Sequence, residues 1–134
     1  MKFTVKEKEY ELDKEKLSAF FNDEEAPIKD INEDDILNII ENIKPDFDVA
    51  YYSSPCEECK NGGEKRKAYK FFEYHFYIYT KDREYVTNSI QVEQDNTSFK
   101  RLSSIGKVDD SYIVSIIVCS DCGDFTIEIE EFEI

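Results

Sequence analysis

Four cysteines in two short pairs constrain this chain more than any other feature of its sequence. Cys56 and Cys59 are separated by two residues, as are Cys119 and Cys122, and no other position is a cysteine. A CxxC turn directs two sulfur atoms to one side of the backbone, and two such turns supply the four thiolates that tetrahedral zinc accepts. The sequence therefore predicts one structural zinc ion held by all four cysteines, with no coordination position left for water.

Two other interpretations of the cysteines stay open at this point. A thiol-based redox sensor or oxidoreductase would use the same CxxC pairs to form reversible disulfides. Alternatively, the four residues are ordinary small apolar side chains with no ligand. The separation of the pairs does not favour zinc by itself, because fifty-nine residues lie between Cys59 and Cys119, whereas the common four-cysteine zinc pattern has roughly 15–20.

Strand directions provide an independent reason to expect the two pairs to meet. Alternating apolar and polar residues predict strands at about residues 46–52, 69–80 and 85–93 and a weak strand at about 99–105. The nearly continuous apolar run at 112–118 predicts a central strand covered on both faces, and alternation resumes in a last strand from Phe125. If each strand reverses the direction of the one before it, the first and the fifth run the same way. Both CxxC pairs then follow strands that end at the same end of the sheet.

The N-terminal third of the chain is predicted to form a hairpin and two helices. Apolar residues alternate with polar ones over residues 3–12, which is typical of a short hairpin. Asp13 is expected to cap a helix over about 14–21. Asn32 is expected to cap a second helix, which ends at Lys44-Pro45 because proline disfavours helical geometry in the residue before it.

Together these patterns predict the α+β fold class. We expect a mostly antiparallel sheet of five or more strands, about two N-terminal helices on one face, and a zinc-knuckle clamp at one end of the sheet. At 134 residues the chain fits a single domain. The hairpin and helices would occupy about residues 1–45, and the sheet with its paired CxxC knuckles about residues 46–134.

Acidic residues dominate the charge of the chain and restrict its partners. The formal net charge is −14, and residues 111–134 carry six acids and no base. Because this distribution repels phosphate, we expect no nucleic-acid partner. The expected partner is a protein, and the alternative that the charge suggests is an acidic mimic that occupies a basic partner's site. The oligomeric state is left open.

The sequence also indicates a cytoplasmic location. The first residues lack the apolar core of a signal peptide, and no stretch is long and apolar enough to span a bilayer, so we expect no membrane partner. Cysteines stay reduced in the cytoplasm, where metal binding is a more common role for them than structural disulfides.

No other group of residues carries a catalytic signature. His75 is the only histidine, and it falls in the middle of the predicted strand 69–80, on the face opposite the apolar side chains. A surface or half-buried position is the simpler interpretation, and a fifth ligand or a general base is the alternative. The sequence therefore favours a non-enzymatic role.

The layout of Cys56, Cys59, Cys119 and Cys122 in an acidic chain of this length resembles a small uncharacterised family of clostridial-type bacterial proteins with two CxxC motifs. The second pair, Cys119-Ser120-Asp121-Cys122-Gly123, is also similar to the knuckles of zinc ribbons. The family resemblance implies no assigned activity. The sequence as a whole predicts a non-enzymatic cytoplasmic zinc-binding protein with an interaction or adaptor role.

Overall fold

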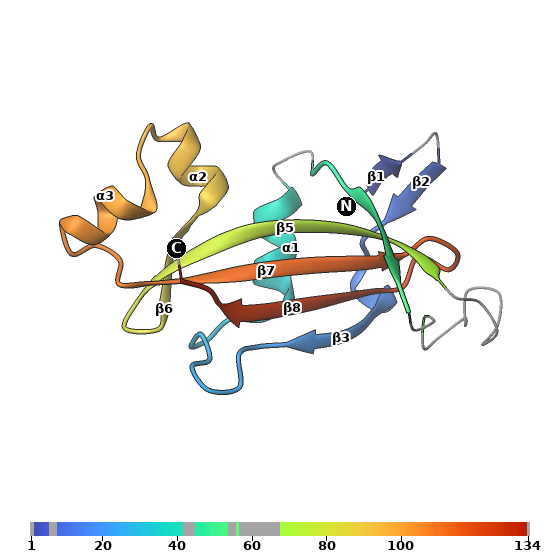
Figure 1. Ribbon diagram of the computed structural model, residues 1–134, viewed down its shortest axis with the longest axis horizontal. Helices are drawn as coiled ribbons and strands as arrows, with labels where there is room; N and C mark the ends of the chain where they lie inside the picture. Colours follow the sequence, from blue (N-terminus) through green and yellow to red (C-terminus); the bar gives the residue numbers. More distant parts are fainter. Residues whose placement is uncertain (1, 6–7, 42–44, 54–55, 57–67, 134) are drawn as a thin grey trace. The chain divides into compact units, whose positions relative to one another are not determined.

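A computed structural model describes residues 2–5, 8–41, 45–53, 56 and 68–133 of the chain (Figure 1). The residues group into two compact units. The first unit comprises Met1–Phe20, Asn32–Tyr74 and Ile116–Ile127, and the second comprises Phe21–Ile31, His75–Ser115 and Glu128–Ile134. Strands β5 (Tyr69–Lys81), β7 (Asp110–Cys119) and β8 (Phe125–Glu131) contribute residues to both units.

The first unit contains an N-terminal hairpin and parts of five strands of the main sheet. β1 (Lys2–Val5) and β2 (Lys8–Glu11) pair antiparallel, which confirms the predicted hairpin. The strands of the main sheet follow the order β3-β8-β7-β5-β4, where β3 is Leu17–Phe21 and β4 is Asp48–Tyr52. β4 runs antiparallel to the start of β5, whereas β3 and β8 point in the same direction (Figure 1).

Helix α1 (Glu33–Glu41) begins where the sequence predicts, because Asn32 and Asp35 cap it reciprocally. The Asp35 backbone N–H donates a hydrogen bond to Asn32 Oδ1 (3.0 Å), and the Asn32 backbone N–H donates to Asp35 Oδ2 (3.0 Å). This capping box satisfies two backbone donors at the helix start. Ile36 and Ile40 lie about one turn apart and are fully buried, so the apolar side of α1 faces the core.

The helix predicted over residues 14–21 is not present. Lys14–Lys16 form one 3-10 turn, η1, in which Asp13 Oδ1 accepts a hydrogen bond from the Glu15 backbone N–H (3.1 Å). Capping by Asp13 is therefore confirmed, but the next five residues form β3. Phenylalanines at the end of this segment favour strands, and pairing with β8 satisfies backbone groups that a short isolated helix would satisfy only marginally.

In the second unit, short helices replace one predicted strand and the second half of another. β5 turns into β6 (Glu84–Asn88) through Asp82 and Arg83, whose φ angles of 52° and 65° are typical of tight two-residue hairpins. The predicted strand at 85–93 ends early because Asn88 Oδ1 accepts hydrogen bonds from two following N–H groups and starts α2 (Ser89–Gln94). Ser98 Oγ similarly starts α3 (Phe99–Ser104), where a weak strand was predicted.

The predicted α+β fold class, with its N-terminal face of two helices, is wrong. Among the described residues the structure is sheet-rich with three short α-helices, and two of them, α2 and α3, lie between β6 and β7 in the chain. The main sheet has six strands, with β6 paired to β5, and it mixes parallel and antiparallel neighbours. The physical reason is that residues 17–21 joined the sheet edge instead of covering the sheet as a helix.

β7 is buried along most of its length, as predicted for a central strand. Its residues Tyr112, Val114, Ile116 and Val118 are all 0 % exposed. In the second unit, the hydroxyl of Tyr112 donates a hydrogen bond to the backbone carbonyl of Ala26 (2.6 Å). Burial raises the pKa of Tyr112 to about 12, and the nearby carboxylates of Asp110 and Glu131 add to the increase.

This buried tyrosine should make stability fall at high pH. An unfolded tyrosine has a pKa of about 10, so above pH 10 the unfolded state loses this proton while the folded state keeps it. The contribution of Tyr112 is complete below pH 10, and the free energy of unfolding should then fall by up to about 1.4 kcal/mol per pH unit until about pH 12. Urea unfolding of the wild type and of Tyr112→Phe at pH 9 and pH 11 measures the difference.

We expect Tyr112→Phe to lose less stability than the wild type between these two pH values. Tyr51→Phe is the matched control, because Tyr51 is 66 % exposed and its removal should leave the wild-type pH dependence unchanged. Equal losses in the wild type and Tyr112→Phe would contradict the prediction.

Candidate metal centre

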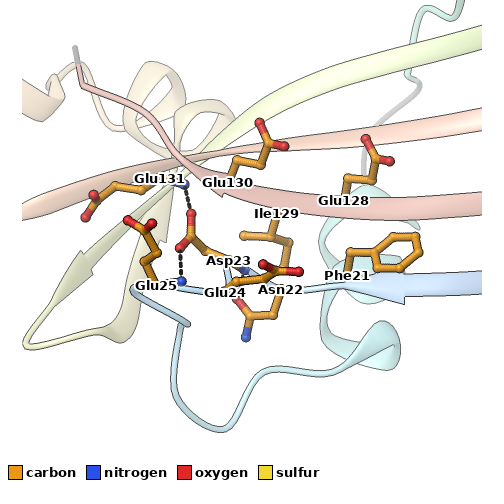
Figure 2. Close-up of a pocket in the computed structure, with 9 residues that line it drawn as sticks. All are labelled: Phe21, Asn22, Asp23, Glu24, Glu25, Glu128, Ile129, Glu130 and Glu131. Atoms are coloured by element: carbon orange, nitrogen blue, oxygen red, sulfur yellow. Dashed lines mark hydrogen bonds between the residues drawn. The ribbon is translucent and has the colours of Figure 1, made fainter.

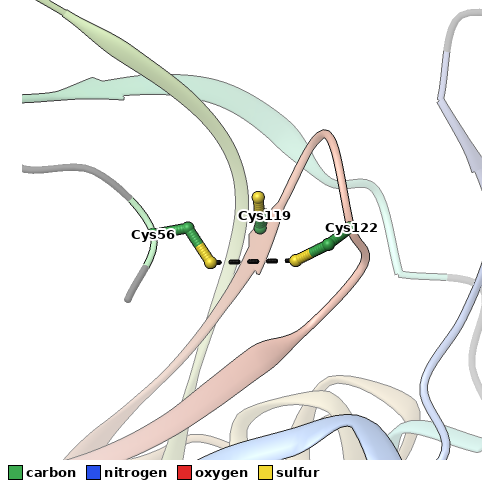
Figure 3. A group of neighbouring side chains, drawn as sticks. All are labelled: Cys56, Cys119 and Cys122. Carbon is green, nitrogen blue, oxygen red and sulfur yellow. Dashed lines mark hydrogen bonds between the residues drawn. The ribbon is translucent and has the colours of Figure 1, made fainter. Parts of the chain in front are cut away.

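Three of the four cysteines lie together in the first unit (Figure 3). Cys119 is the last residue of β7, Cys122 follows it in the next turn, and Cys56 lies beyond the end of β4. The Sγ atoms of all three are within 4.8 Å of one another. Cys119 and Cys56 are buried, whereas Cys122 is half-buried. Cys59, the fourth predicted ligand, lies outside the described residues.

The sulfur separations suit a shared metal ion. Cys56 Sγ and Cys122 Sγ are 3.7 Å apart (Figure 3), which is far longer than the ~2.05 Å of a disulfide bond. Four thiolates around tetrahedral zinc, each at ~2.3 Å from the metal, lie ~3.8 Å from one another. The distance between these two sulfurs is therefore that of two ligands on one ion, and three cysteines close together could hold a metal ion.

The cysteines meet because two strand ends lie beside the start of β5. β4 pairs with β5 in a register that places Tyr52 opposite Tyr69, so the segment that leads to Cys56 begins at this point. From the other side, Ser120 donates two hydrogen bonds to the Lys70 carbonyl, through its hydroxyl (2.9 Å) and its backbone N–H (3.4 Å). The ends of β4 and β7 are thereby held at one place along β5.

Local hydrogen bonds shape the turn that carries the second CxxC pair. The Cys119 N–H donates to the Asp124 carbonyl (2.9 Å), and the Gly123 N–H donates to the Cys119 carbonyl (3.1 Å). Gly123 has a φ of +79°, which glycine adopts without the steric cost that other residues have. The buried Tyr10 hydroxyl donates a hydrogen bond to the Ser120 carbonyl (3.0 Å). Tyr10 belongs to β2 of the N-terminal hairpin, so this bond anchors the turn to a strand that is not part of the main sheet.

A pocket of about 340 Å³ lies beside Cys122 in the first unit. Besides Cys122, its lining residues are Glu9, Tyr10, Glu11, Lys16, Asp121 and Gly123. Lys16 Nζ lies 3.5 Å from the position that a Cβ on Gly123 would occupy. Three carboxylates and one ammonium group therefore surround the accessible side of the cluster. Sequence reasoning missed Tyr10 and Lys16 as neighbours of the cysteines, and no sequence motif marks either of them.

Gly123→Ala should weaken metal binding as well as folding. A positive φ costs a non-glycine residue roughly 1–2 kcal/mol, and at Gly123 relaxation of that strain would displace Cys122, the adjacent member of the cysteine cluster. Gly106→Ala is the matched control, because Gly106 has a similar φ of +74° and no atom within 4 Å of its Cβ position. Both variants should lose about the same stability in chelator, measured by urea unfolding. Only Gly123→Ala should lower zinc affinity, and equal affinities would contradict the prediction.

A second, acidic pocket in the second unit has a structural explanation. It measures about 490 Å³ and is lined by Phe21, Asn22, Asp23, Glu24, Glu25, Glu128, Ile129, Glu130 and Glu131 (Figure 2). Asp23 accepts hydrogen bonds from the backbone N–H groups of Glu131 (2.9 Å), Ala26 (2.8 Å) and Glu25 (2.9 Å), and these bonds lower its pKa. Asp23 therefore holds its loop against the end of β8, and its lowered pKa does not suit proton donation near neutral pH.

His75 lies in the second unit, on the surface. Its side chain is exposed, and Nδ1 is 2.9 Å from Ser115 Oγ. The surface position is the one that the sequence predicted. The only group of cysteine, histidine or acidic side chains close enough to hold a metal, among the described residues, is the cysteine cluster.

The fold and the site define a sheet-rich protein with a compact cysteine cluster suited to a metal ion. The chain belongs to the family described as Protein of unknown function (DUF3785), which matches residues 1–134. This membership confirms the predicted resemblance to an uncharacterised family. Comparisons with curated proteins and with solved structures gave no match. In the part of the chain that the structure describes, no helix has the length and apolar character needed to cross a bilayer.

Proposed function

We propose that this chain is a non-enzymatic zinc-binding protein in which Cys56, Cys59, Cys119 and Cys122 hold one structural zinc ion. The observation that carries the proposal is the convergence of three sulfur atoms within 4.8 Å of one another from two distant parts of the chain. Cys59 follows Cys56 at CxxC spacing, which is the spacing that places two sulfurs on one ion. Four thiolates leave no position for water, so the site would stabilise the fold rather than catalyse hydrolysis.

Zinc is the metal that this ligand set favours. Soft thiolates in a tetrahedral arrangement select zinc or iron over magnesium and calcium, which prefer oxygen ligands. The bound ion would join the segment after β4 to the turn after β7. Because fifty-nine residues lie between Cys59 and Cys119, the unfolded state would lose this link and its stabilisation.

Metal analysis of the purified protein tests the proposal. We expect about one equivalent of zinc per chain and four thiols that react with a thiol reagent much faster once a chelator has removed the metal. Cobalt substitution should give the visible absorption of a tetrahedral tetrathiolate site, which distinguishes four sulfur ligands from three. Less than about half an equivalent of zinc, with all thiols immediately reactive, would overturn the proposal. A stoichiometric amount of iron in place of zinc would show that the four cysteines form an iron–thiolate site.

We further propose that the protein acts in the cytoplasm and that its partner is another protein. The net charge of −14 supports the choice of partner, because a strongly acidic surface repels nucleic acid and attracts basic protein surfaces. Fluorescence polarisation with labelled DNA and RNA should show no binding at 50 mM salt, where phosphate-binding proteins bind most tightly. Binding to either nucleic acid under these conditions would contradict the assignment of the partner.

A further inference from the structure

The three described cysteines differ in their exposure to solvent. Cys119 is 1 % exposed and Cys56 is 8 % exposed, whereas Cys122 is half-buried and lines the pocket beside the cluster. A reagent that enters this pocket therefore reaches the sulfur of Cys122 before it reaches either of the other two. Thiolate accessibility is one of the main factors that determine which cysteine is oxidised first.

We propose that a hydroperoxide opens the zinc site at Cys122 and that a disulfide between Cys56 and Cys122 then closes the oxidised form. The inference rests on the proposed zinc site and adds its regulation. Its distinguishing feature is that the disulfide joins the two CxxC pairs to each other. In a CxxC oxidoreductase the bond forms within a single pair.

The chemistry balances with hydrogen peroxide as the oxidant. The Cys122 thiolate attacks one peroxide oxygen, the O–O bond breaks, and hydroxide leaves while the sulfur becomes a sulfenic acid. The Cys56 thiolate then attacks the Cys122 sulfur, the S–O bond breaks, and a second hydroxide leaves as the S–S bond forms. The two sulfurs lose two electrons, the peroxide gains them, two protons convert the hydroxides to water, and the zinc ion is released with its charge unchanged.

Geometry favours Cys56 as the resolving residue. Its sulfur is 3.7 Å from that of Cys122, so the two atoms need to approach by only ~1.7 Å to reach bonding distance. Cys119 is less able to move, because it ends β7 and its backbone N–H is bonded to the Asp124 carbonyl (2.9 Å). The adjacent Ser120 is fixed by hydrogen bonds to Lys70 and from Tyr10. A disulfide between Cys56 and Cys122 therefore needs no movement of the restrained end of β7.

Charge in the pocket should make the site selective for neutral oxidants. Glu9, Glu11 and Asp121 outnumber Lys16 around Cys122, so the local field repels anions and leaves uncharged hydrogen peroxide unaffected. Dithiobis(nitrobenzoate), a dianionic disulfide, should therefore react slowly with Cys122. Glu11→Gln should accelerate that reaction roughly two- to fivefold at low salt and leave the rate with hydrogen peroxide unchanged. Glu15→Gln, an exposed glutamate in η1 that does not line the pocket, is the matched control and should change neither rate.

The decisive experiment oxidises the zinc-loaded full-length protein with hydrogen peroxide. Zinc release is followed with a chromogenic chelator, and disulfides are mapped by mass spectrometry of non-reduced peptides. We expect one zinc ion released for each peroxide consumed and a cross-linked peptide that joins Cys56 to Cys122. A disulfide mainly within Cys56–Cys59 or Cys119–Cys122, or full zinc retention with intact thiols, would overturn the inference while leaving the zinc site established. If the protein carries no zinc before oxidation, both proposals fail, and the starting metal content shows which case applies.

Discussion

Replacing Cys122 with serine should reduce bound zinc from about one equivalent per chain to a small fraction of that value. Serine has nearly the same shape as cysteine, but its hydroxyl does not ionise near neutral pH and is a poor zinc ligand. Because Cys122 is a half-buried turn residue, the substitution should leave the core intact. The variant therefore separates the loss of a ligand from the loss of the fold, which Cys119→Ser at a buried strand end would not do.

The loss of zinc should appear directly in the stability of the protein. With free zinc at about 1,000 times its dissociation constant, binding adds about 4 kcal/mol to the free energy of unfolding of the wild type. Cys122→Ser should lack this increment in urea unfolding experiments. Wild type and variant should then unfold at the same urea concentration once a chelator has removed the metal.

Asp121→Asn is the matched control for this prediction. Asp121 occupies the same turn and lines the same pocket as Cys122, but carboxylates are not needed when four thiolates are available. The control should keep about one equivalent of zinc and the stability increment that accompanies it. Full zinc content in Cys122→Ser would contradict the assignment of this residue as a ligand.

Phe125→Ala should cause a large loss of stability. Phe125 begins β8 and is 1 % exposed. Removing a fully buried phenylalanine ring leaves a cavity and costs about 3–5 kcal/mol. Total stability for a chain of this size is about 5–15 kcal/mol, so the variant should unfold at a much lower urea concentration, measured by circular dichroism.

A second phenylalanine just beyond β8 provides the comparison. Phe132 is 43 % exposed, and its ring centroid lies 5.5 Å from that of Tyr77. Phe132→Ala should cost less than half as much as Phe125→Ala, because the exposed part of the ring loses no burial and water fills the space. Equal losses in the two variants would show that burial does not distinguish these positions.

The convergence of the cysteines could be predicted from the sequence, although the predicted path between them is partly wrong. The prediction assumed five strands that alternate in direction, with one at 85–93 and another at 99–105. The structure has β6 and two helices in that region. The two CxxC segments still meet, because β4 and β7 are both neighbours of β5. Pairing next to one common strand places their ends together regardless of what the chain does between them.

Local patterns predicted the elements whose signals are long or unambiguous. The alternation in β5 and the apolar run in β7 lie where they were predicted, and so does the Asn32 cap of α1. The errors fall on short segments with ambiguous patterns. Pairing of β3 with β8 limited the helical turn that Asp13 caps to Lys14–Lys16. In α2 and α3, single capping side chains at Asn88 and Ser98 overcame apolar patterns that also fit strands.

The sequence by itself determined the ligand chemistry of this protein: which residues carry thiols, how each pair is spaced, and how acidic the chain is. Only the tertiary structure decided which sulfurs are neighbours and which one faces solvent. Cys56 and Cys122 are 66 residues apart in the chain and 3.7 Å apart in space, and Lys16 and Tyr10 reach the same turn from the N-terminal segment. Spacing along the chain reports on contacts within a few residues, whereas these contacts depend on strand order and register.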